Sequence, residues 1–257
     1  MNSKANIALC GTGHVAWKLG EALHQAGYTI SFVWGRNRSD REALARLLGA
    51  QPVSELQQLP LTELCIMALP DAVIAEVAQQ IAPDASRLVL HCAGTGQLDW
   101  LAPHPRRGIL WPLQSIRKEL QYDWKTVPLL CDASDEASLA EILALGGSLS
   151  ELCEAADQKS REAYHLAAVT TANFSNFLFE QAFDLLKQQQ LDHRLLLPIL
   201  RYQLDAFASN QAPWERQTGP ARRGDLPTIQ KQLQQIAERP AHAALYRLFS
   251  ELIQNKS

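Results

Sequence analysis

The sequence predicts an α/β domain followed by an all-helical domain. Up to about residue 150, short apolar runs alternate with helical patterns, as in an open sheet with helical crossovers. A turn with two glycines joins the first apolar run to the first helical pattern. Between Gly147 and Pro198 there is no glycine or proline, and strand patterns do not return afterwards. The two domains are therefore predicted at residues 1–152 and 153–257.

Six apolar runs of the first domain are expected to be strands of a parallel sheet, because they are short and apolar on both faces. They are Ile7–Cys10, Thr29–Trp34, Leu64–Ala68, Leu88–Cys92, Gly108–Trp111 and Val127–Cys131. The helices expected between them are His14–Ala26, Asp40–Leu48, Ala72–Ile81 and Asp135–Leu145.

The second domain is expected to begin with one long helix, residues 154–190, which exceeds the roughly 8–20 residues usual in globular proteins. Residues 192–209, 225–239 and 241–254 predict three more helices.

Composition and charge exclude several classes of function. The net charge of −3 and the absence of a basic run argue against nucleic acid as a partner. No apolar stretch approaches the roughly 18 residues of a membrane span. The five cysteines form no C-x-x-C pair, which favours reduced thiols and a cytoplasmic location. The seven histidines show no paired spacing, so no metal site is expected.

The turn "GTGHVA" fits the pattern G-x-G-x-x-A and lies between an expected strand and an expected helix. Gly11 permits the tight turn, Gly13 lets a pyrophosphate approach the backbone, and Ala16 lets the helix pack on the strand. Free N–H groups at the helix start then hold the phosphates. An ordinary tight turn is the alternative. The expected phosphate-binding residues are Gly11, Thr12, Gly13, His14 and Val15.

The end of the second strand indicates which cofactor is bound. An acidic residue there would bind a ribose 2′-hydroxyl and favour NAD. The sequence instead has Arg36, Asn37 and Arg38, and a guanidinium group suits a 2′-phosphate. We therefore expect NADP rather than NAD; a solvated loop whose arginines touch nothing is the alternative. Asp40 is expected to cap the following helix, a contact with the ribose being the alternative.

Two later strand ends belong to the same edge of the expected sheet, where ligands of open α/β folds gather. Leu69 and Pro70 follow the third strand and are expected to line the cofactor site, with Asp71 as a helix cap. His91, Gly94 and Thr95 follow the fourth strand and are candidates to face the nicotinamide, turn chemistry being the alternative.

The long helix carries a polar stripe. In a regular helix His165, Asn173 and Asn176 share an arc of about 100°. Histidine can donate a proton to a forming alkoxide or amine, and an amide can orient a carbonyl. A buried histidine satisfied by a neighbour is the alternative. In "TGPARRGD", Arg222 and Arg223 are candidates for anion binding, and Asp225 for a helix cap. An ion pair between Arg223 and Asp225 within the loop is the alternative.

Three pieces together resemble a bacterial family that joins a Rossmann-like domain to a helical domain of unknown function, DUF2520. They are "GTGHVA", "AYHLAAVTTANFSNFL" and "TGPARRGD", in this order. The family is similar to pyrroline-5-carboxylate reductases, ketopantoate reductases and β-hydroxyacid dehydrogenases. The resemblance implies a nicotinamide cofactor, reduction of C=O or C=N groups or the reverse reaction, and a helical domain that often dimerises.

The resemblance also implies roles for single residues. Ketopantoate reductases and hydroxyacid dehydrogenases use a lysine on the first long helix of the second domain, with an asparagine one or two turns later. His165 takes the lysine position, and Asn173 lies two turns on. Val169 replaces the nearer asparagine, and Trp111 stands where relatives tend to have histidine. The substrate therefore cannot be copied from those relatives.

These observations predict an NADP-dependent oxidoreductase acting on a small carbonyl or imine. His165 and Asn173 are the expected catalytic residues, and His91, Asn176 and Arg223 are expected substrate contacts. A non-catalytic NADP(H)-binding sensor or scaffold is the alternative, and a deazaflavin-linked NADP reductase shares the same turn.

Apolar residues of the long helix predict a homodimer through the helical domain, unless they form that domain's own core. They are Phe174, Phe177, Leu178, Phe179, Phe183 and Leu186.

Overall fold

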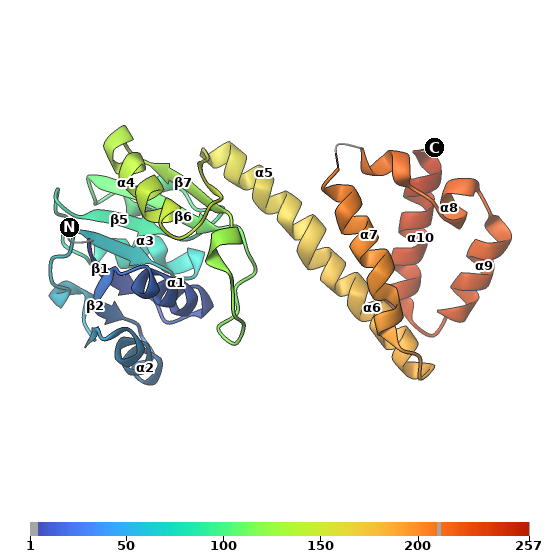
Figure 1. The fold of residues 1–257 in the computed structure, drawn as a ribbon, viewed down its shortest axis with the longest axis horizontal. Helices are drawn as coiled ribbons and strands as arrows, with labels where there is room; N and C mark the ends of the chain where they lie inside the picture. Colours follow the sequence, from blue (N-terminus) through green and yellow to red (C-terminus); the bar gives the residue numbers. More distant parts are fainter. Residues whose placement is uncertain (1–4, 210–211, 257) are drawn as a thin grey trace. The chain divides into compact units, whose positions relative to one another are not determined.

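The computed structural model describes residues 5–209 and 212–256. The chain divides into a nucleotide unit, up to Thr171, and a helical unit, from Ala172 onward. The nucleotide unit is built on one eight-stranded sheet of order β3-β2-β1-β4-β5-β6-β7-β8 (Figure 1). The expected α/β domain followed by an all-helical domain is confirmed, since all eight strands of the described residues precede the helical unit.

The nucleotide unit contains eight strands and five α-helices among the described residues. The strands are β1 Asn6–Cys10, β2 Thr29–Trp34, β3 Gln51–Val53, β4 Leu64–Met67, β5 Leu88–His91, β6 Arg106–Pro112, β7 Leu129–Ala133 and β8 Cys153–Ala155. The helices are α1 His14–Gln25, α2 Arg38–Leu48, α3 Asp71–Gln79, α4 Glu136–Gly147 and α5 Gln158–Ala168.

Helices cover both faces of the sheet. Successive strand residues point to opposite faces, so Ile7 and Leu9 of β1 pack with α1, α2 and α4. Ala8 and Cys10 pack on the other face with α3. Every one of these four β1 residues is fully buried, which explains why β1 is apolar throughout.

Strands β1 to β6 are parallel, so their carboxyl ends lie at one edge of the sheet. The chain order reverses direction between β1 and β4, which is where open α/β sheets bind ligands. Strand β7 is antiparallel to β6, contrary to the expectation of a fully parallel sheet. The link from β6 to β7 contains the 3₁₀ turn Trp124–Thr126 and no α-helix, whereas the crossover between parallel strands is usually an α-helix.

Strands β3 and β8 were not predicted. Each has three residues and lies at an edge of the sheet, and Gln51, Pro52, Glu154 and Ala155 are exposed. Proline is tolerated at such an edge because the missing N–H faces solvent. Strands this short and exposed carry no alternating pattern to detect.

Helix α2 begins two residues earlier than expected. Its N-cap is Asn37, whose side chain accepts a hydrogen bond from the backbone N–H of Asp40 at 3.1 Å. Asp40 therefore lies in the first turn and is not the cap. In the same way α3 begins at Asp71, and its N-cap position is Pro70, so the expected cap at Asp71 is wrong.

The predicted long helix is continuous from Gln158 to Gln188 but not regular. Helix α5 passes into a π-helical segment, Val169–Asn173, and then into α6, Phe174–Gln188. Strand β8 occupies the expected first residues of this helix. The chain divides into its two units inside the π-helical segment, after Thr171, whereas the sequence placed the boundary at residue 152.

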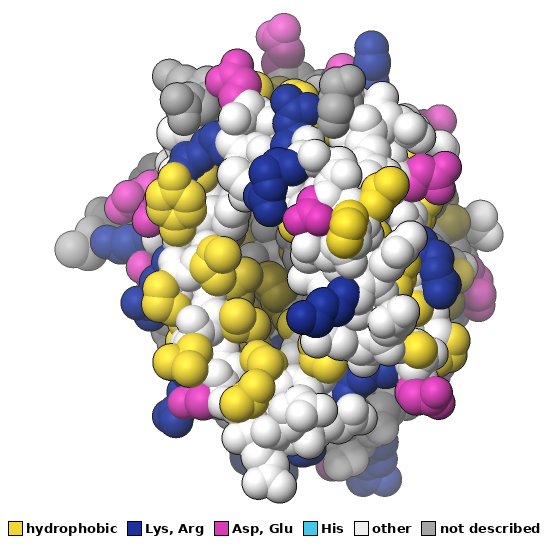
Figure 2. All heavy atoms as spheres, turned by 90° about the vertical axis from the view of Figure 1, so that its right-hand side faces the viewer, with side chains coloured by type: hydrophobic (Ala, Val, Ile, Leu, Met, Phe, Trp, Pro, Cys, Tyr) yellow, Lys and Arg dark blue, Asp and Glu magenta, His cyan; other side chains and the backbone are white. Residues whose placement is uncertain are grey.

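The helical unit buries few side chains within the described residues: Ala206, Ala221, Ile229, Ile236, Ala243 and Ser250. None of α6 is buried. Phe174 is 60% exposed and Phe179 50%, so these residues do not form a core of the unit (Figure 2 shows hydrophobic side chains over one of its faces). Its remaining helices are α7 Leu197–Phe207, α8 Pro220–Arg223, α9 Leu226–Gln235 and α10 Pro240–Asn255.

Among the described residues, no helix has both the length and the apolar character that crossing a bilayer requires. All five cysteines are free. The sulfur atoms of Cys10 and Cys65 lie 3.8 Å apart, and those of Cys131 and Cys153 lie 3.6 Å apart, both as thiol contacts.

Candidate active site

The turn after β1 contains two glycines with different structural needs. Gly11 has φ +131°, and a Cβ there would lie 2.2 Å from the carbonyl oxygen of Ala68, so the fold itself requires glycine. Gly13 has φ −79°, and a Cβ there would meet no protein atom within 4 Å. Because Gly13 lines a cavity, its missing side chain is explained by access for a ligand.

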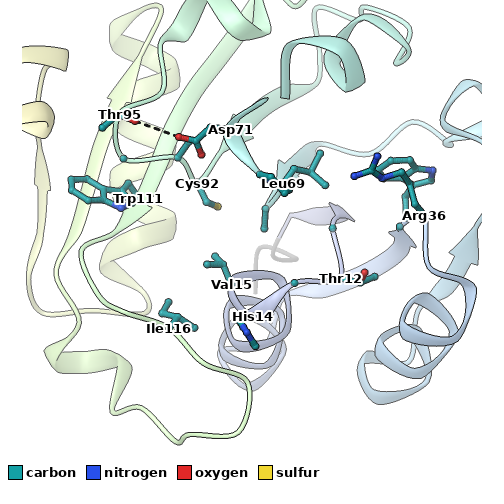
Figure 3. A pocket seen from close by; sticks show the side chains of 18 of the residues that line it. Thr12, His14, Val15, Arg36, Leu69, Asp71, Cys92, Thr95, Trp111 and Ile116 are labelled. Atoms are coloured by element: carbon teal, nitrogen blue, oxygen red, sulfur yellow. Dashed lines mark hydrogen bonds between the residues drawn. The ribbon is translucent and has the colours of Figure 1, made fainter. Parts of the chain in front are cut away.

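This cavity lies at the carboxyl ends of the parallel strands and has a volume of about 620 Å³. Figure 3 shows its lining side chains, with Arg36 at one end and Trp111 at the other. Twelve residues proposed from the sequence line it: Gly11, Thr12, Gly13, His14, Val15, Arg36, Asn37, Leu69, Pro70, Gly94, Thr95 and His165. The structure thus brings together residues from α1, the ends of β2, β4 and β5, and α5.

The end of β2 offers one arginine to the cavity, not two. Arg36 is exposed and lines the cavity, and within the described part of the chain it makes no ion pair. Arg38 does not line the cavity. Its Nε donates to Glu42 at 2.6 Å across one helical turn, and its side chain is 82% exposed. The expectation that Arg38 binds the cofactor is therefore not supported by its position.

The turn after β4 contributes a carboxylate. Asp71, in the first turn of α3, lines the cavity, and its Oδ2 accepts a hydrogen bond from the Thr95 hydroxyl at 3.3 Å (Figure 3). This bond connects the turn after β4 to the turn after β5. Leu69 and Pro70 lie in the same turn and line the cavity, as expected.

His91 does not line the cavity, so its position does not support the expected contact with the substrate. Its side chain is fully buried. Nε2 donates to the Gln97 carbonyl at 3.2 Å, and Nδ1 accepts from the Ala93 N–H at 3.2 Å. Burial lowers the pKa of His91 to about 4, the Gln97 bond opposes this, and the charge of Arg161 adds to the lowering. A neutral His91 therefore fixes both ends of the loop that follows β5.

The end of the cavity opposite Arg36 is formed by an indole and an imidazole. The rings of Trp111, on β6, and His165, on α5, lie with centroids 5.9 Å apart. Trp111 also covers Gly94, where a Cβ would approach the indole to 2.4 Å. His165 is half-buried, so its ring is held by the unit yet open to the cavity.

The other proposed substrate residues belong to the helical unit. Asn173, Asn176 and Arg223 are exposed, and none of them lines the cavity. The predicted arc holds for a regular helix, and the π-helical segment Val169–Asn173 departs from that regular rotation. The roles of Asn173, Asn176 and Arg223 stay predictions.

In "TGPARRGD", Asp225 caps α9 and accepts from the N–H and hydroxyl of Thr228 at 3.2 and 2.7 Å. These bonds lower the pKa of Asp225, as does the nearby charge of Arg223. The guanidinium of Arg222 lies over the ring of Trp214, 4.9 Å from its centroid.

Eight cavity residues are not among the predicted site residues: Trp34, Gly35, Ala68, Asp71, Cys92, Ala93, Trp111 and Ile116. Cys92 and Ala93 belong to the same turn as Gly94 and Thr95, which the sequence predicts to face the nicotinamide. Burial raises the pKa of the Cys92 thiol to about 12, so this group stays protonated and acts as an apolar wall. The sequence singles out Trp111 only through the family resemblance, since relatives tend to have histidine at this position before Pro112.

These residues fit a phosphorylated dinucleotide. The turn leaves open space at Gly13, the first N–H groups of α1 follow it, and Arg36 supplies a cation at the end of β2. When bound, a nicotinamide cofactor supplies or accepts a hydride, and the protein supplies position and electrostatics.

Comparison with protein families divides the sequence in two. Residues 2–115 match the Rossmann-like domain, and residues 127–253 match the domain of unknown function DUF2520. No curated protein matches the sequence.

Several solved structures resemble this chain over nearly its whole length. Protein BF3122 from Bacteroides fragilis, named as a candidate NADP oxidoreductase, is 32% identical with a TM-score of 0.89, covering 98% of this chain and 99% of that one. An imine reductase variant from Myxococcus stipitatus in complex with NAD+ is 16% identical with a TM-score of 0.66, covering 98% and 93%. A pyrroline-5-carboxylate reductase from Coxiella burnetii is 15% identical with a TM-score of 0.62, covering 98% and 97%. The last two show likeness of fold.

Proposed function

The chain belongs to the family that joins a Rossmann-like domain to DUF2520, and on that premise we propose that it is an NADP-dependent oxidoreductase. It transfers a hydride between the nicotinamide and a small carbonyl or imine. The observation that carries the proposal is a single cavity with a phosphate-binding turn and Arg36 at one end and His165 at the other.

NADP is preferred over NAD because the end of β2 presents a cation and no acid. Arg36 is free to form charge-assisted hydrogen bonds with a 2′-phosphate. A carboxylate, which would bind the ribose 2′-hydroxyl of NAD, is not at this position: Asp40 lies inside α2. The name of BF3122 from Bacteroides fragilis supports the same cofactor.

His165 is the proposed proton donor. Its imidazole faces the cavity beside Trp111, where it can protonate a forming alkoxide or amine. Trp111, Cys92 and Ile116 form apolar walls that limit water around the reacting atoms. Imine and pyrroline-5-carboxylate reductases share the fold, which supports a C=N or C=O group as the acceptor.

The helical unit is proposed to dimerise. Asn173 would orient the substrate, and Asn176 and Arg223 would contact it; all three are exposed polar side chains. The exposed phenylalanines of α6 support a homodimer through this unit. A cytoplasmic location, supported by five free cysteines, belongs to the same proposal.

The test is NADPH oxidation with a panel of keto acids and cyclic imines. We expect turnover with at least one of them, and His165→Ala to reduce kcat by about 100-fold or more while leaving the Kd for NADPH unchanged. His24→Ala, an exposed histidine of α1, is the matched control and should not change kcat.

Three outcomes separate the alternatives. Turnover that His165→Ala abolishes supports the proposal. NADPH binding without turnover of any substrate favours a sensor or scaffold. No binding of NADPH or NADH at millimolar concentration in calorimetry overturns the nucleotide site itself.

A further inference from the structure

Arg161, on α5, is a buried cation to which the sequence assigned no role. Its side chain is 1% exposed. Nη1 donates to the carbonyl of Ala156 at 2.8 Å and to the carboxylate of Asp132, and Nη2 donates to the carbonyl of Gly96 at 3.1 Å. Burying a guanidinium is costly unless it is paired and hydrogen-bonded, so these three acceptors stabilise its position.

The three acceptors come from separate segments of the nucleotide unit. Ala156 follows β8, Asp132 lies on β7, and Gly96 closes the loop after β5. That loop, residues 92–95, lines the cavity. Arg161 therefore connects the base of α5 to the cavity wall and to the antiparallel part of the sheet.

The connected loop has little freedom of its own. A Cβ at Gly96 would lie 2.4 Å from the ring of His91, and His91 bonds to Ala93 and Gln97. The charge of Arg161 helps to keep the pKa of His91 low, so Nδ1 of His91 remains free to accept from Ala93. Arg161 thus acts on the loop directly, through Gly96, and through His91.

His165 lies one turn after Arg161 on the same helix. Its ring contacts Trp111, and Trp111 covers Gly94 in the loop that Arg161 holds. The contacts form a closed path from Arg161 through α5, His165 and Trp111 to the loop, and back to Arg161. The Arg161 side chain therefore fixes both the position of α5, which carries His165, and the position of the loop.

We infer that Arg161, anchored by Asp132, is a positioning residue that holds the His165 imidazole beside Trp111, which covers Gly94 in the wall of the cavity. The inference rests on the proposed role of His165. Arg161 itself touches neither the cavity nor a reacting atom, and it acts through α5 and the loop.

The test uses the whole protein with three variants. Removing only one charge of a buried pair leaves the other uncompensated, so Arg161→Met is combined with Asp132→Leu. Arg161→Lys keeps the charge but cannot reach all three acceptors. Arg87→Met is the matched control, because Arg87 is 3% exposed and donates to the carbonyls of Pro60 and Thr62, away from the cavity.

In the double variant we expect a folded protein by circular dichroism, a Kd for NADPH within about threefold of wild type, and a kcat lower by 10- to 100-fold, about 1.4–2.7 kcal/mol. Arg161→Lys should recover part of the thermal stability and little of kcat. Arg87→Met should change stability without changing kcat. A folded double variant with kcat within threefold of wild type would overturn the inference.

A second measurement does not depend on activity. Histidine-labelled protein gives NMR signals for the His165 ring, identified by their loss in His165→Gln and shifted by the ring current of Trp111. These signals should move in the double variant and stay in place in Arg87→Met. Unmoved signals overturn the inference even if the enzyme is active. If no substrate turns over, the proposed function fails, and moved signals still support the positioning.

Discussion

Gly11 and Gly13 lie two residues apart at the start of the site, and only Gly11 is required by the backbone. We predict that Gly13→Ala changes the free energy of unfolding by less than about 1 kcal/mol, because φ is negative and the position is open. The same change should weaken NADPH binding by about tenfold or more, since the methyl group occupies the space for the pyrophosphate. Calorimetry and thermal melting measure the two effects.

Gly11→Ala is the contrasting variant. Its φ of +131° and the 2.2 Å approach to Ala68 predict a loss of stability of about 2 kcal/mol or more. If Gly13→Ala bound NADPH as wild type does, the turn would be an ordinary strand–helix turn.

His91 predicts a pH dependence of stability. Its pKa is about 4 in the folded protein and about 6.5 in the unfolded chain, so below pH 6.5 the unfolded state binds more protons. The free energy of unfolding should therefore fall as pH falls from 6.5 towards 4, with His91 contributing about 2 kcal/mol between pH 7 and pH 5. Urea unfolding at the two pH values measures this loss.

The comparison variant is His91→Asn, which keeps an acceptor for Ala93 and does not titrate. The difference between its two unfolding free energies should be smaller than in wild type by about the same 2 kcal/mol. An equal difference in both proteins would mean that His91 titrates normally.

At the scale of elements, the junction of β2 and α2 should decide between NADPH and NADH. We predict that Arg36→Ala weakens NADPH binding by about 10- to 100-fold, the value of a hydrogen-bonded charge, and leaves NADH binding within about threefold. Arg38→Ala is the control: Arg38 is already paired with Glu42 and should affect neither cofactor. Equal effects of the two changes would contradict a specific 2′-phosphate contact.

Local sequence patterns were sufficient to predict most helices and strands and the residues of the cofactor half of the site. The residues that line the phosphate end follow strands in the sequence itself, so strand ends and turn chemistry identify them. The edge strands β3 and β8 are too short for such a pattern, and a regular 100° rotation cannot reveal the π-helical segment.

The other half of the site depends on contacts between distant residues. Arg161 looks like a solvated helix residue until Asp132, on a neighbouring strand, supplies its partner. Trp111 and His165 are far apart in the sequence, and their rings come together only in the folded chain. His91 lies at the end of β5, where the sequence analysis expected substrate contacts. Its burial could not be predicted, because it depends on the packing of distant segments around the side chain.

For the whole molecule we predict a dimer formed by the helical unit. Light scattering after size exclusion should give twice the mass of one chain. Leu204→Glu, on α7, should shift the protein towards monomer, because Leu204 is 70% exposed among other apolar side chains. Leu61→Glu, at a position 57% exposed in the nucleotide unit, is the control. A wild-type monomer would show that the exposed apolar side chains serve another purpose.

The antiparallel strand β7 has a practical consequence for anyone who divides this protein. The DUF2520 match starts at residue 127, yet β7, β8 and α5 belong to the sheet-containing unit. A shortened chain that stops at residue 126 would leave the backbone N–H and C=O groups along one edge of β6 unpaired, and such an exposed edge can pair with strands of other chains. Cutting after Thr171 keeps that edge covered and retains the Arg161 anchor, so fragment design should follow hydrogen-bonded neighbours in preference to the borders of sequence families.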